Sequence, residues 1–123
     1  MTTILVVDDD ESMRALIRLH LSAAGYRVVE AADAIVAGKC LLEHAPDLII
    51  ADVKMPYMDG IEFITALRAD ESIPYIPVIF VTAYEESADQ AQALGSTVLV
   101  KPIVADELLK AVADTLAKHA ALH

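Results

Sequence analysis

Four short apolar runs in this chain each lead directly into polar residues that could do chemistry together. The first run ends at the acid pair Asp8–Asp9, and the second ends at Asp52. A later run ends at Thr82, and the last ends at Lys101. Carboxylates, a hydroxyl and an ammonium group at one place can hold a divalent cation and a phosphoryl group together. The sequence therefore indicates phosphoryl chemistry, provided that the fold brings these side chains to one site.

The three acids suit a magnesium site that includes a nucleophile. Oxygen ligands in this number are typical of Mg²⁺, which keeps several waters and bridges to phosphate. Carboxylates held close together repel one another without a cation, so a fold that keeps such a cluster is expected to use it. A carboxylate oxygen of Asp52 could attack phosphorus, with Lys101 and Thr82 placed to contact the phosphoryl oxygens.

Alternating strand and helix patterns supply the elements that must position these side chains. Short apolar runs bounded by polar or turn residues predict buried parallel strands at residues 3–7, 27–31, 47–51, 77–81 and 97–100. Apolar residues at helical spacing predict helices at about 12–24, 33–44, 60–69, 86–94 and 105–119. The strand over 27–31 is the most polar and is expected at a sheet edge. In an open parallel sheet, ligands bind beyond the carboxyl ends of the strands, so the polar residues should converge there.

Local signals indicate where the helices begin. Asp10, Glu11 or Ser12 can cap the first helix, and acids there also suit the helix dipole. Asp59–Gly60 predicts a turn that caps the helix over 60–69. These acids are therefore expected to serve the helices rather than the chemistry.

Composition narrows the class of protein. The 123 residues suffice for one domain with one core, and 56% of them are hydrophobic. The net charge of −10 comes without a visible basic patch, which argues against a nucleic-acid partner. No apolar run reaches membrane-spanning length, and the N-terminus shows no signal peptide, so a cytoplasmic protein is expected. The single cysteine, Cys40, excludes an intrachain disulfide.

Four motifs together make the chain resemble the receiver domains of two-component response regulators, including the chemotaxis receivers. They are the acid pair in Val7-Asp8-Asp9, the segment from Ala51-Asp52 to Asp59-Gly60, Val81-Thr82-Ala83, and Val100-Lys101-Pro102. The resemblance covers essentially the whole chain, and each motif falls at a strand end. One such motif would be weak support, but four in this order are specific.

The resemblance implies a flavodoxin-like α/β fold, with a five-stranded parallel sheet in the order 2-1-3-4-5 and helices on both faces. It implies that Asp52 accepts the phosphoryl group, with Asp9 and Asp52 as direct Mg²⁺ ligands and Asp8 as a ligand mainly through water. The backbone carbonyl of Lys54 would complete the protein ligands. Lys101 and Thr82 would contact the phosphoryl oxygens, and the Lys101–Pro102 bond would be cis.

The same resemblance implies a role in signal transduction. Residues 1–123 would form one receiver domain with no output domain. The phosphoryl donor would be a histidine kinase or a histidine phosphotransfer protein, and the downstream protein target is unknown. The chain would assist its own phosphorylation and dephosphorylation without being an enzyme in the usual sense. It could act as a partner-binding switch, a phosphorelay carrier or a phosphate sink.

Two features depart from the family pattern. The stretch from Thr82 to Lys101 is a few residues shorter than usual, so the helix at 86–94 or its loops must absorb the difference. Val98 occupies a position where many relatives carry Tyr or Phe, which puts the usual aromatic relay in doubt. The response to phosphorylation is therefore expected to run through the Thr82–Tyr84 loop and the segment 84–94.

Three other functions are weaker alternatives. A Mg²⁺-dependent phosphohydrolase usually needs a second acid two residues after the nucleophile, where this chain has Lys54. A flavin-binding flavodoxin needs a phosphate-cradling loop after the first strand, and Asp8–Asp9 would repel a phosphate there. A pseudo-receiver that only binds partners would not need the intact acid set.

The remaining candidate residues have smaller expected roles. Tyr84 and Lys54 could orient or hinder the water that hydrolyses an acyl phosphate. His20 and His44 have no ligand partner at metal spacing and are expected to be solvated or half-buried. Cys40 is expected to be a core thiol of the second helix.

Overall fold

The alternating patterns form five strands and four helices in the part of the chain that the structure describes. This computed structural model describes residues 1–83 and 97–122. The strands are β1 (Thr3–Val7), β2 (Arg27–Ala31), β3 (Leu48–Asp52), β4 (Val78–Thr82) and β5 (Thr97–Val100). The helices are α1 (Glu11–Ala23), α2 (Ala34–His44), α3 (Gly60–Ala69) and α5 (Ala105–Leu122). The helix predicted at 86–94 and the shortened stretch before Lys101 lie outside the described residues.

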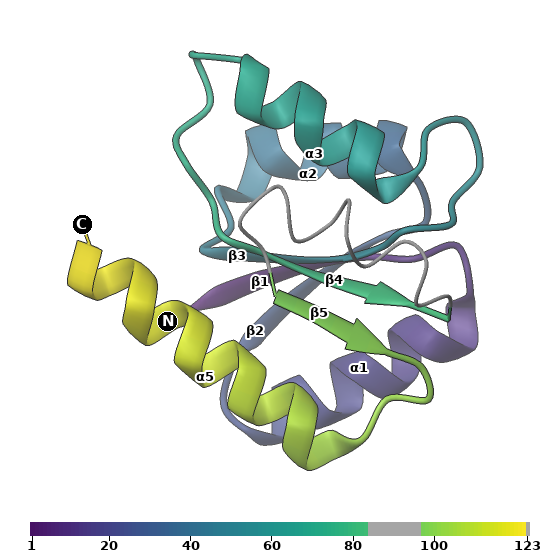
Figure 1. Cartoon of the computed structure of the whole chain (residues 1–123), viewed down its shortest axis with the longest axis vertical. Coiled ribbons are helices and arrows are strands. Elements are labelled where there is room, and N and C mark those ends of the chain that lie inside the picture. The colour runs from purple at the N-terminus through teal and green to yellow at the C-terminus, as the bar shows by residue number, and fades with distance from the viewer. Residues whose placement is uncertain (84–96, 123) are drawn as a thin grey trace.

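The strands form one parallel sheet in the order β2-β1-β3-β4-β5, which confirms the predicted fold class and strand order. The polar strand β2 lies at an edge, as expected. In Figure 1 the strand arrows run toward the same side of the molecule, so their carboxyl ends share one edge of the sheet. This edge is where the predicted site residues should meet.

Two strands are displaced by one residue from their predicted bounds. The ladder of β3 and β4 pairs Asp52 with Val81, and the ladder of β4 and β5 pairs Thr82 with Val100. The prediction that Asp52 and Thr82 follow their strands was therefore wrong, because each is the last residue of its strand. The pairing continues beyond the apolar run: Val53 N donates to Val81 O at 3.1 Å, and Lys101 N donates to Thr82 O at 2.8 Å.

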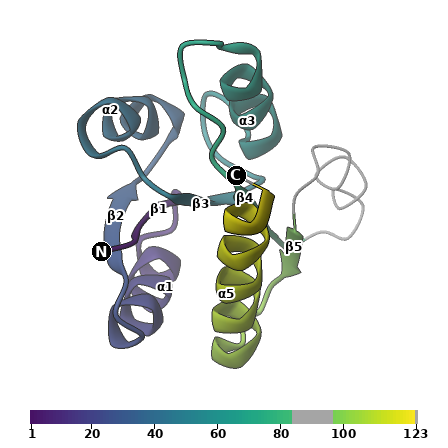
Figure 2. The ribbon, with the colours of Figure 1, turned by 90° about the vertical axis from the view of Figure 1, so that its left-hand side faces the viewer.

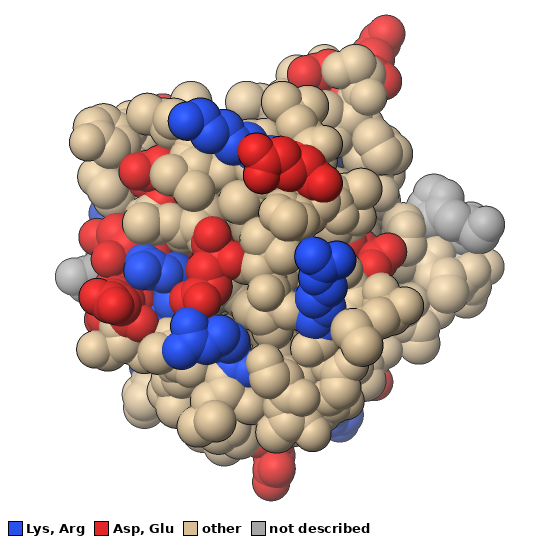
Figure 3. Space-filling view, turned by 180° about the vertical axis from the view of Figure 1, so that it is seen from behind, with Lys and Arg blue, Asp and Glu red and all other residues tan. Residues whose placement is uncertain are grey.

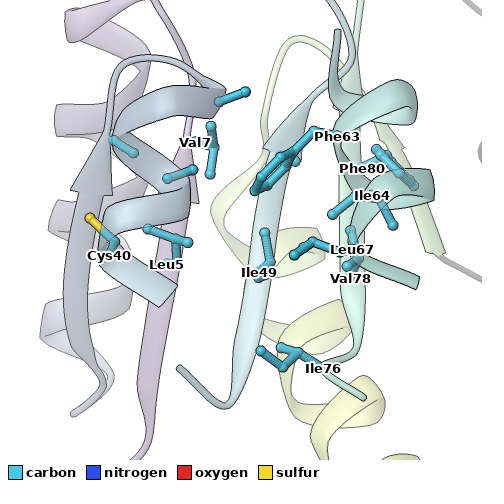
Figure 4. Close-up of a cluster of buried hydrophobic side chains, with 14 of the residues drawn as sticks. Leu5, Val7, Cys40, Ile49, Phe63, Ile64, Leu67, Ile76, Val78 and Phe80 are labelled. Atoms are coloured by element: carbon cyan, nitrogen blue, oxygen red, sulfur yellow. The ribbon is translucent and has the colours of Figure 1, made fainter. Parts of the chain in front are cut away.

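Alternation along the strands gives the sheet two apolar faces, each covered by two of the helices that the structure describes. One face packs against α2 and α3, and Figure 4 shows Leu5, Val7 and Ile49 of the sheet opposite Phe63 and Leu67 of α3. The other face packs against α1 and α5. Its central residues are Ile4, Val6, Ile17, Leu21, Leu48, Ile50, Ile79, Val81, Leu108 and Val112. In Figure 2 the two helix pairs lie on opposite sides of the sheet.

Side-chain caps define the starts of three helices, and those of α1 and α3 agree with the sequence signals, whereas the cap of α2 was not predicted. Asp10 caps α1, accepting from Ser12 N at 2.9 Å and from Met13 N at 3.3 Å. Asp33 caps α2 by accepting from Val36 N at 2.9 Å. Asp59 forms a capping box with Glu62 at the start of α3. None of the described helices combines the length and apolar character needed to cross a membrane.

Candidate functional site

The carboxyl ends of β1 and β3 bring the three predicted acids together. Asp8 and Asp9 follow β1, and Asp52 ends the neighbouring strand β3. Each offers one carboxylate oxygen, and these oxygens all lie within 4.8 Å of one another. Asp8 and Asp52 are buried, with exposed fractions of 1% and 6%, whereas Asp9 is exposed. The sheet therefore builds an acid cluster that is open to solvent on the side of Asp9.

Lys101 reaches this acid cluster from the end of β5. Its Nζ lies 3.3 Å from Asp52 Oδ2 and 3.6 Å from Asp8 Oδ2. The Lys101–Pro102 peptide bond is cis, as the family resemblance implied. Thr82, at the end of β4, is buried, and its carbonyl accepts from Lys101 N. Four strand ends thus contribute to one place.

Burial and neighbouring charges shift the pKa values of Asp8 and Lys101 in the acid cluster. Burial raises the pKa of Asp8 to about 6, and the nearby charge of Asp52 adds to that rise, although the Asp10 N–H that Asp8 accepts at 2.9 Å opposes it. Burial alone would lower the pKa of Lys101, but the carboxylates of Asp52 and Asp8 outweigh this effect and raise it. The ammonium therefore stays charged, while burial keeps the carboxyl of Asp8 harder to ionise than an ordinary aspartate despite the nearby Lys101.

The residues present fit a bound divalent cation. Asp8 Oδ2 is buried and accepts no hydrogen bond from any residue in the described ranges 1–83 and 97–122. Lys101 Nζ lies 3.6 Å from this oxygen, beyond hydrogen-bonding distance, so the oxygen still has room for a closer cationic partner. Oxygen donors from Asp8, Asp9 and Asp52 form the donor set that hard cations prefer. The acid cluster could therefore hold a metal ion.

The loop after β3 holds Asp52 closely. Lys54 N donates to Asp52 Oδ1 at 3.2 Å, so the main chain and Lys101 approach different oxygens of this carboxylate. Gly60 N donates to Val53 O at 2.9 Å, and a Cβ at Gly60 would lie only 2.2 Å from the carbonyl oxygen of Asp52. The glycine therefore lets the start of α3 press directly against the main chain of Asp52.

Sequence reasoning missed Arg14, which tethers the acid loop. Its Nη1 donates to the carbonyl oxygen of Asp8 at 2.5 Å, and its Nε lies 3.5 Å from Glu30 Oε1. Arg18 Nη1 reaches the other oxygen, Glu30 Oε2, at 2.6 Å. Figure 3 shows basic side chains among the acidic ones that gather near the edge toward which the strands run. The available signal was the position of Arg14 in the first turn of α1, directly after the acid pair.

Several other candidates lie away from the acid cluster or cannot be placed. His20 and His44 are half-buried in α1 and α2, as expected. Cys40 is buried in α2, and its Sγ donates to Glu30 O at 3.8 Å, so the prediction of a core thiol is confirmed. Tyr84 lies outside the described residues, and so does the predicted response in the segment 84–94.

Comparisons with known proteins agree with this geometry. Residues 4–113 match the model of the response regulator receiver domain family. The DNA-binding dual master transcriptional regulator RpaA of Synechocystis sp. is 36% identical over 112 residues, covering 89% of this chain and 46% of that protein. Response regulator Rre1 of Synechocystis sp. is 35% identical over 123 residues, covering 97% of this chain and 53% of that protein. The chain thus spans about half the length of these relatives.

Solved structures show the same fold at similar identity. The chemotaxis protein CheY4 of Vibrio cholerae is 36% identical with a TM-score of 0.84, covering 94% of this chain and 98% of that chain. A response regulator receiver domain protein from Clostridium thermocellum is 25% identical with a TM-score of 0.89, covering 100% of both chains. The family match spans most of the sequence, and the acid cluster lies where the four motifs meet. The chain therefore belongs to the response regulator receiver domain family, whose members are phosphoacceptor switches.

Proposed function

We propose that Asp52 is the phosphoacceptor of this receiver domain. The observation that carries the proposal is the environment of its carboxylate, which is buried at the end of β3, beside Asp8 and Asp9, and 3.3 Å from Lys101 Nζ. The donor is a phosphohistidine of a histidine kinase or of a histidine phosphotransfer protein. An oxygen of Asp52 bonds to phosphorus while the phosphorus–nitrogen bond breaks, and the leaving imidazole takes up a proton.

The chain's own residues position this transfer. The Lys54 N–H and the Lys101 ammonium approach opposite oxygens of Asp52, which fixes the carboxylate plane and leaves lone pairs free for attack. As charge moves onto the phosphoryl oxygens, Lys101 can follow it from Asp52 to the new group, and the Thr82 hydroxyl is proposed as a second contact. These groups assist phosphorylation and later hydrolysis of the acyl phosphate.

Mg²⁺ is the proposed cofactor of this site. Asp8, Asp9 and Asp52 would hold it, together with the carbonyl of Lys54. When bound, it supplies positive charge that offsets both the acids and the incoming phosphoryl group. Asp9 is the exposed member of the acid cluster, so the phosphoryl donor would approach the cluster from the side of Asp9.

The outcome of phosphorylation is proposed to be a change in binding to a downstream protein. The names of the relatives include transcriptional regulators and a chemotaxis protein, which supports a signalling role. Switching, relay to a second histidine protein and phosphate storage all start from the same acyl phosphate. Its measured lifetime and its transfer to a phosphotransfer protein would separate the three.

Intact-mass spectrometry with acetyl phosphate and Mg²⁺ tests the acceptor. The wild type should gain one phosphoryl group, and Asp52→Asn should gain none. Asp59→Asn is the matched control, because this acid lies in the same loop but caps α3, and asparagine caps equally well. Full phosphorylation of Asp52→Asn, or equal loss in the control, would show that the assignment is wrong.

A further inference from the structure

A cavity lies at the opposite end of the sheet from the acid cluster. Its volume is about 910 Å³, within the range of sites for small organic ligands. The lining comes from the ends of α2, α3 and α5 and from the chain that enters β4. Figure 2 looks onto the molecule from the side where α5 ends. Nothing in the proposed phosphoryl transfer uses this cavity.

The lining is mostly apolar and reachable from solvent. Leu41, Phe63, Leu67 and Ile76 contribute aliphatic and aromatic surface. Leu42, which also lines it, is 86% exposed. An exposed leucine in the wall means that a ligand can enter without displacing a packed element. The apolar body of an organic molecule would be buried here at the expense of water.

Helix ends contribute negative potential at this cavity for a reason built into the fold. In a parallel α/β sheet, helices end where strands begin, and a helix carries about half a negative charge at its C-terminus. The lining includes Ala45 just past α2, Asp70 just past α3 and His119 in the last turn of α5. Three helix dipoles therefore direct their negative ends toward one space.

Two carboxylates reinforce this field. Asp47 is held by a hydrogen bond from Thr3 N to its Oδ2 at 2.8 Å. Asp70 accepts from the N–H and the hydroxyl of Ser72, and these hydrogen bonds lower its pKa, so it stays ionised. Among the described lining residues there is no lysine or arginine. Arg68, close by, already donates to Ile76 O at 2.8 Å and lies 4.2 Å over the Tyr75 ring.

We propose that this cavity binds a small organic cation with an apolar body, such as an arylalkyl ammonium compound. The apolar wall takes the body, and the helix C-termini with Asp47 and Asp70 attract the cation. An anion of the same shape would meet the same carboxylates and helix ends and be repelled. The site is independent of the acid cluster, so it can be tested without phosphodonor or Mg²⁺.

A matched set of probes separates charge from shape. Phenylbutylammonium, phenylbutanol and phenylbutyrate share one apolar body and differ in charge. Each is titrated into the whole chain at low salt, followed by amide NMR shifts. The cation should bind on the order of tenfold more tightly than the carboxylate, which corresponds to the combined effect of helix ends and carboxylates. Its shifts should centre on residues 38–47 and 67–76 rather than on Asp8 and Asp9.

Gly38 offers a clean blocking variant. It lines the cavity from the middle of α2, and a Cβ there would meet nothing within 4 Å. Gly38→Leu should place its side chain in the cavity and weaken binding, while Gly38→Ala should leave binding unchanged. Asp47→Asn combined with Asp70→Asn keeps the local hydrogen-bond acceptors and should reduce the preference for the cation to the part that the helix ends supply.

Three results would overturn the proposal. They are equal affinity for the three probes, undiminished binding to Gly38→Leu, and a cation preference that is undiminished by loss of both carboxylates and unaffected by salt. Far-ultraviolet circular dichroism and melting curves check that each variant is folded. Loss of phosphorylation in Asp52→Asn has no bearing on these measurements, so the two proposals fail separately.

Discussion

At the scale of single residues, the two adjacent acids after β1 have different environments. Asp8 is 1% exposed and has an unsatisfied oxygen, whereas Asp9 is exposed. Asp8 is therefore an acid whose neutralisation should stabilise the metal-free protein, because burial is the largest cause of the rise in its pKa.

Asp8→Asn should therefore stabilise the metal-free protein at neutral pH. The pKa of Asp8 rises from 3.8 to about 6 in the folded state, so its ionisation above pH 6 opposes folding. The stability attributable to this group increases as pH falls from 7 toward 4, by up to about 3 kcal/mol. Urea unfolding without Mg²⁺ should show Asp8→Asn to be more stable at pH 7 and less dependent on pH.

Asp9→Asn is the control for this measurement. Its side chain is exposed, so the same loss of charge should change stability much less. An equal gain in both variants would mean that net charge, and not burial, sets the energetics of the acid cluster.

Lys101→Met should keep Mg²⁺ binding and slow phosphorylation. The ammonium is a positive neighbour of Asp8 and Asp52. Its removal leaves more negative charge at the acid cluster, which favours Mg²⁺ binding. The phosphoryl group loses a contact, however, and the rate of transfer from acetyl phosphate should fall by about tenfold or more. Mg²⁺ titrations followed by NMR shifts measure the first effect, and mass spectrometry over time measures the second. Loss of Mg²⁺ affinity would mean that Lys101 chiefly orders the acid loop.

At the scale of elements, the acid loop is anchored from both sides. Asp8 N donates to Ala31 O of β2 at 3.1 Å, and Asp8 O accepts from Arg14 of α1. Glu30, beside Ala31 in β2, pairs with Arg14 as well. The first turn of α1 and the end of β2 therefore hold the main chain of the acid pair in one orientation.

Arg14→Met should weaken Mg²⁺ binding although Arg14 is not a ligand. Without its hydrogen bond the Asp8 carbonyl can turn, and loss of such supporting contacts typically costs about tenfold in metal affinity. Arg18→Met is a matched control, since Arg18 also pairs with Glu30 but has no described contact with Asp8. NMR titration with Mg²⁺ compares them, and Arg14→Lys should restore part of the affinity. Equal losses in both arginine variants would attribute the effect to surface charge.

The start of α3 gives a second prediction at this scale. Gly60→Ala would place a methyl carbon only 2.2 Å from the carbonyl oxygen of Asp52, so the loop or the strand must shift. The expected cost is about 2 kcal/mol or more in unfolding free energy, with impaired phosphorylation. Gly38→Ala is the matched control, because its methyl meets no atom within 4 Å and alanine favours a helix by about 1 kcal/mol. Urea unfolding of both variants should give effects of opposite sign.

At the scale of the whole molecule, the parallel topology separates two electrostatic ends. Helices α1 and α3 begin at the end where β1 and β3 finish, so their positive ends lie toward the acids. The carboxyl-terminal ends of α2, α3 and α5 line the apolar cavity at the opposite end. The same arrangement that favours a phosphoryl group at one end favours a cation at the other.

Mg²⁺ should raise the melting temperature of the whole chain. A ligand that binds only the folded state stabilises it by RT ln(1 + [L]/Kd), about 2.7 kcal/mol at a hundred times Kd. The shift should grow with millimolar Mg²⁺ and shrink in a chain carrying Asp9→Asn and Asp52→Asn. Calorimetric scans that are identical with and without Mg²⁺ would contradict a metal site at the acid cluster.

The order of the described elements, the caps of α1 and α3 and the residues of the acid cluster could be predicted from the sequence. Apolar runs, caps such as Asp59 and polar residues such as Asp52 are signals carried by near neighbours in the chain, so they can be read without a fold. The four motifs then indicated the family, and the strand order followed from that resemblance. The predicted bounds of β3 and β4 were each displaced by one residue, because pairing with the adjacent strand sets where a strand ends.

The burial of Asp8, its tether to Arg14 and the place of the apolar cavity follow from the packing of distant elements. Asp8 and Asp9 are adjacent and chemically identical, and their difference arises from strands and helices far away in the chain. Arg14 acquires its role because β2 brings Glu30 beside α1. The cavity exists because three helices end around one space without filling it. Burial, hydrogen-bond partners and cavities depend on distances between elements, which no local pattern contains.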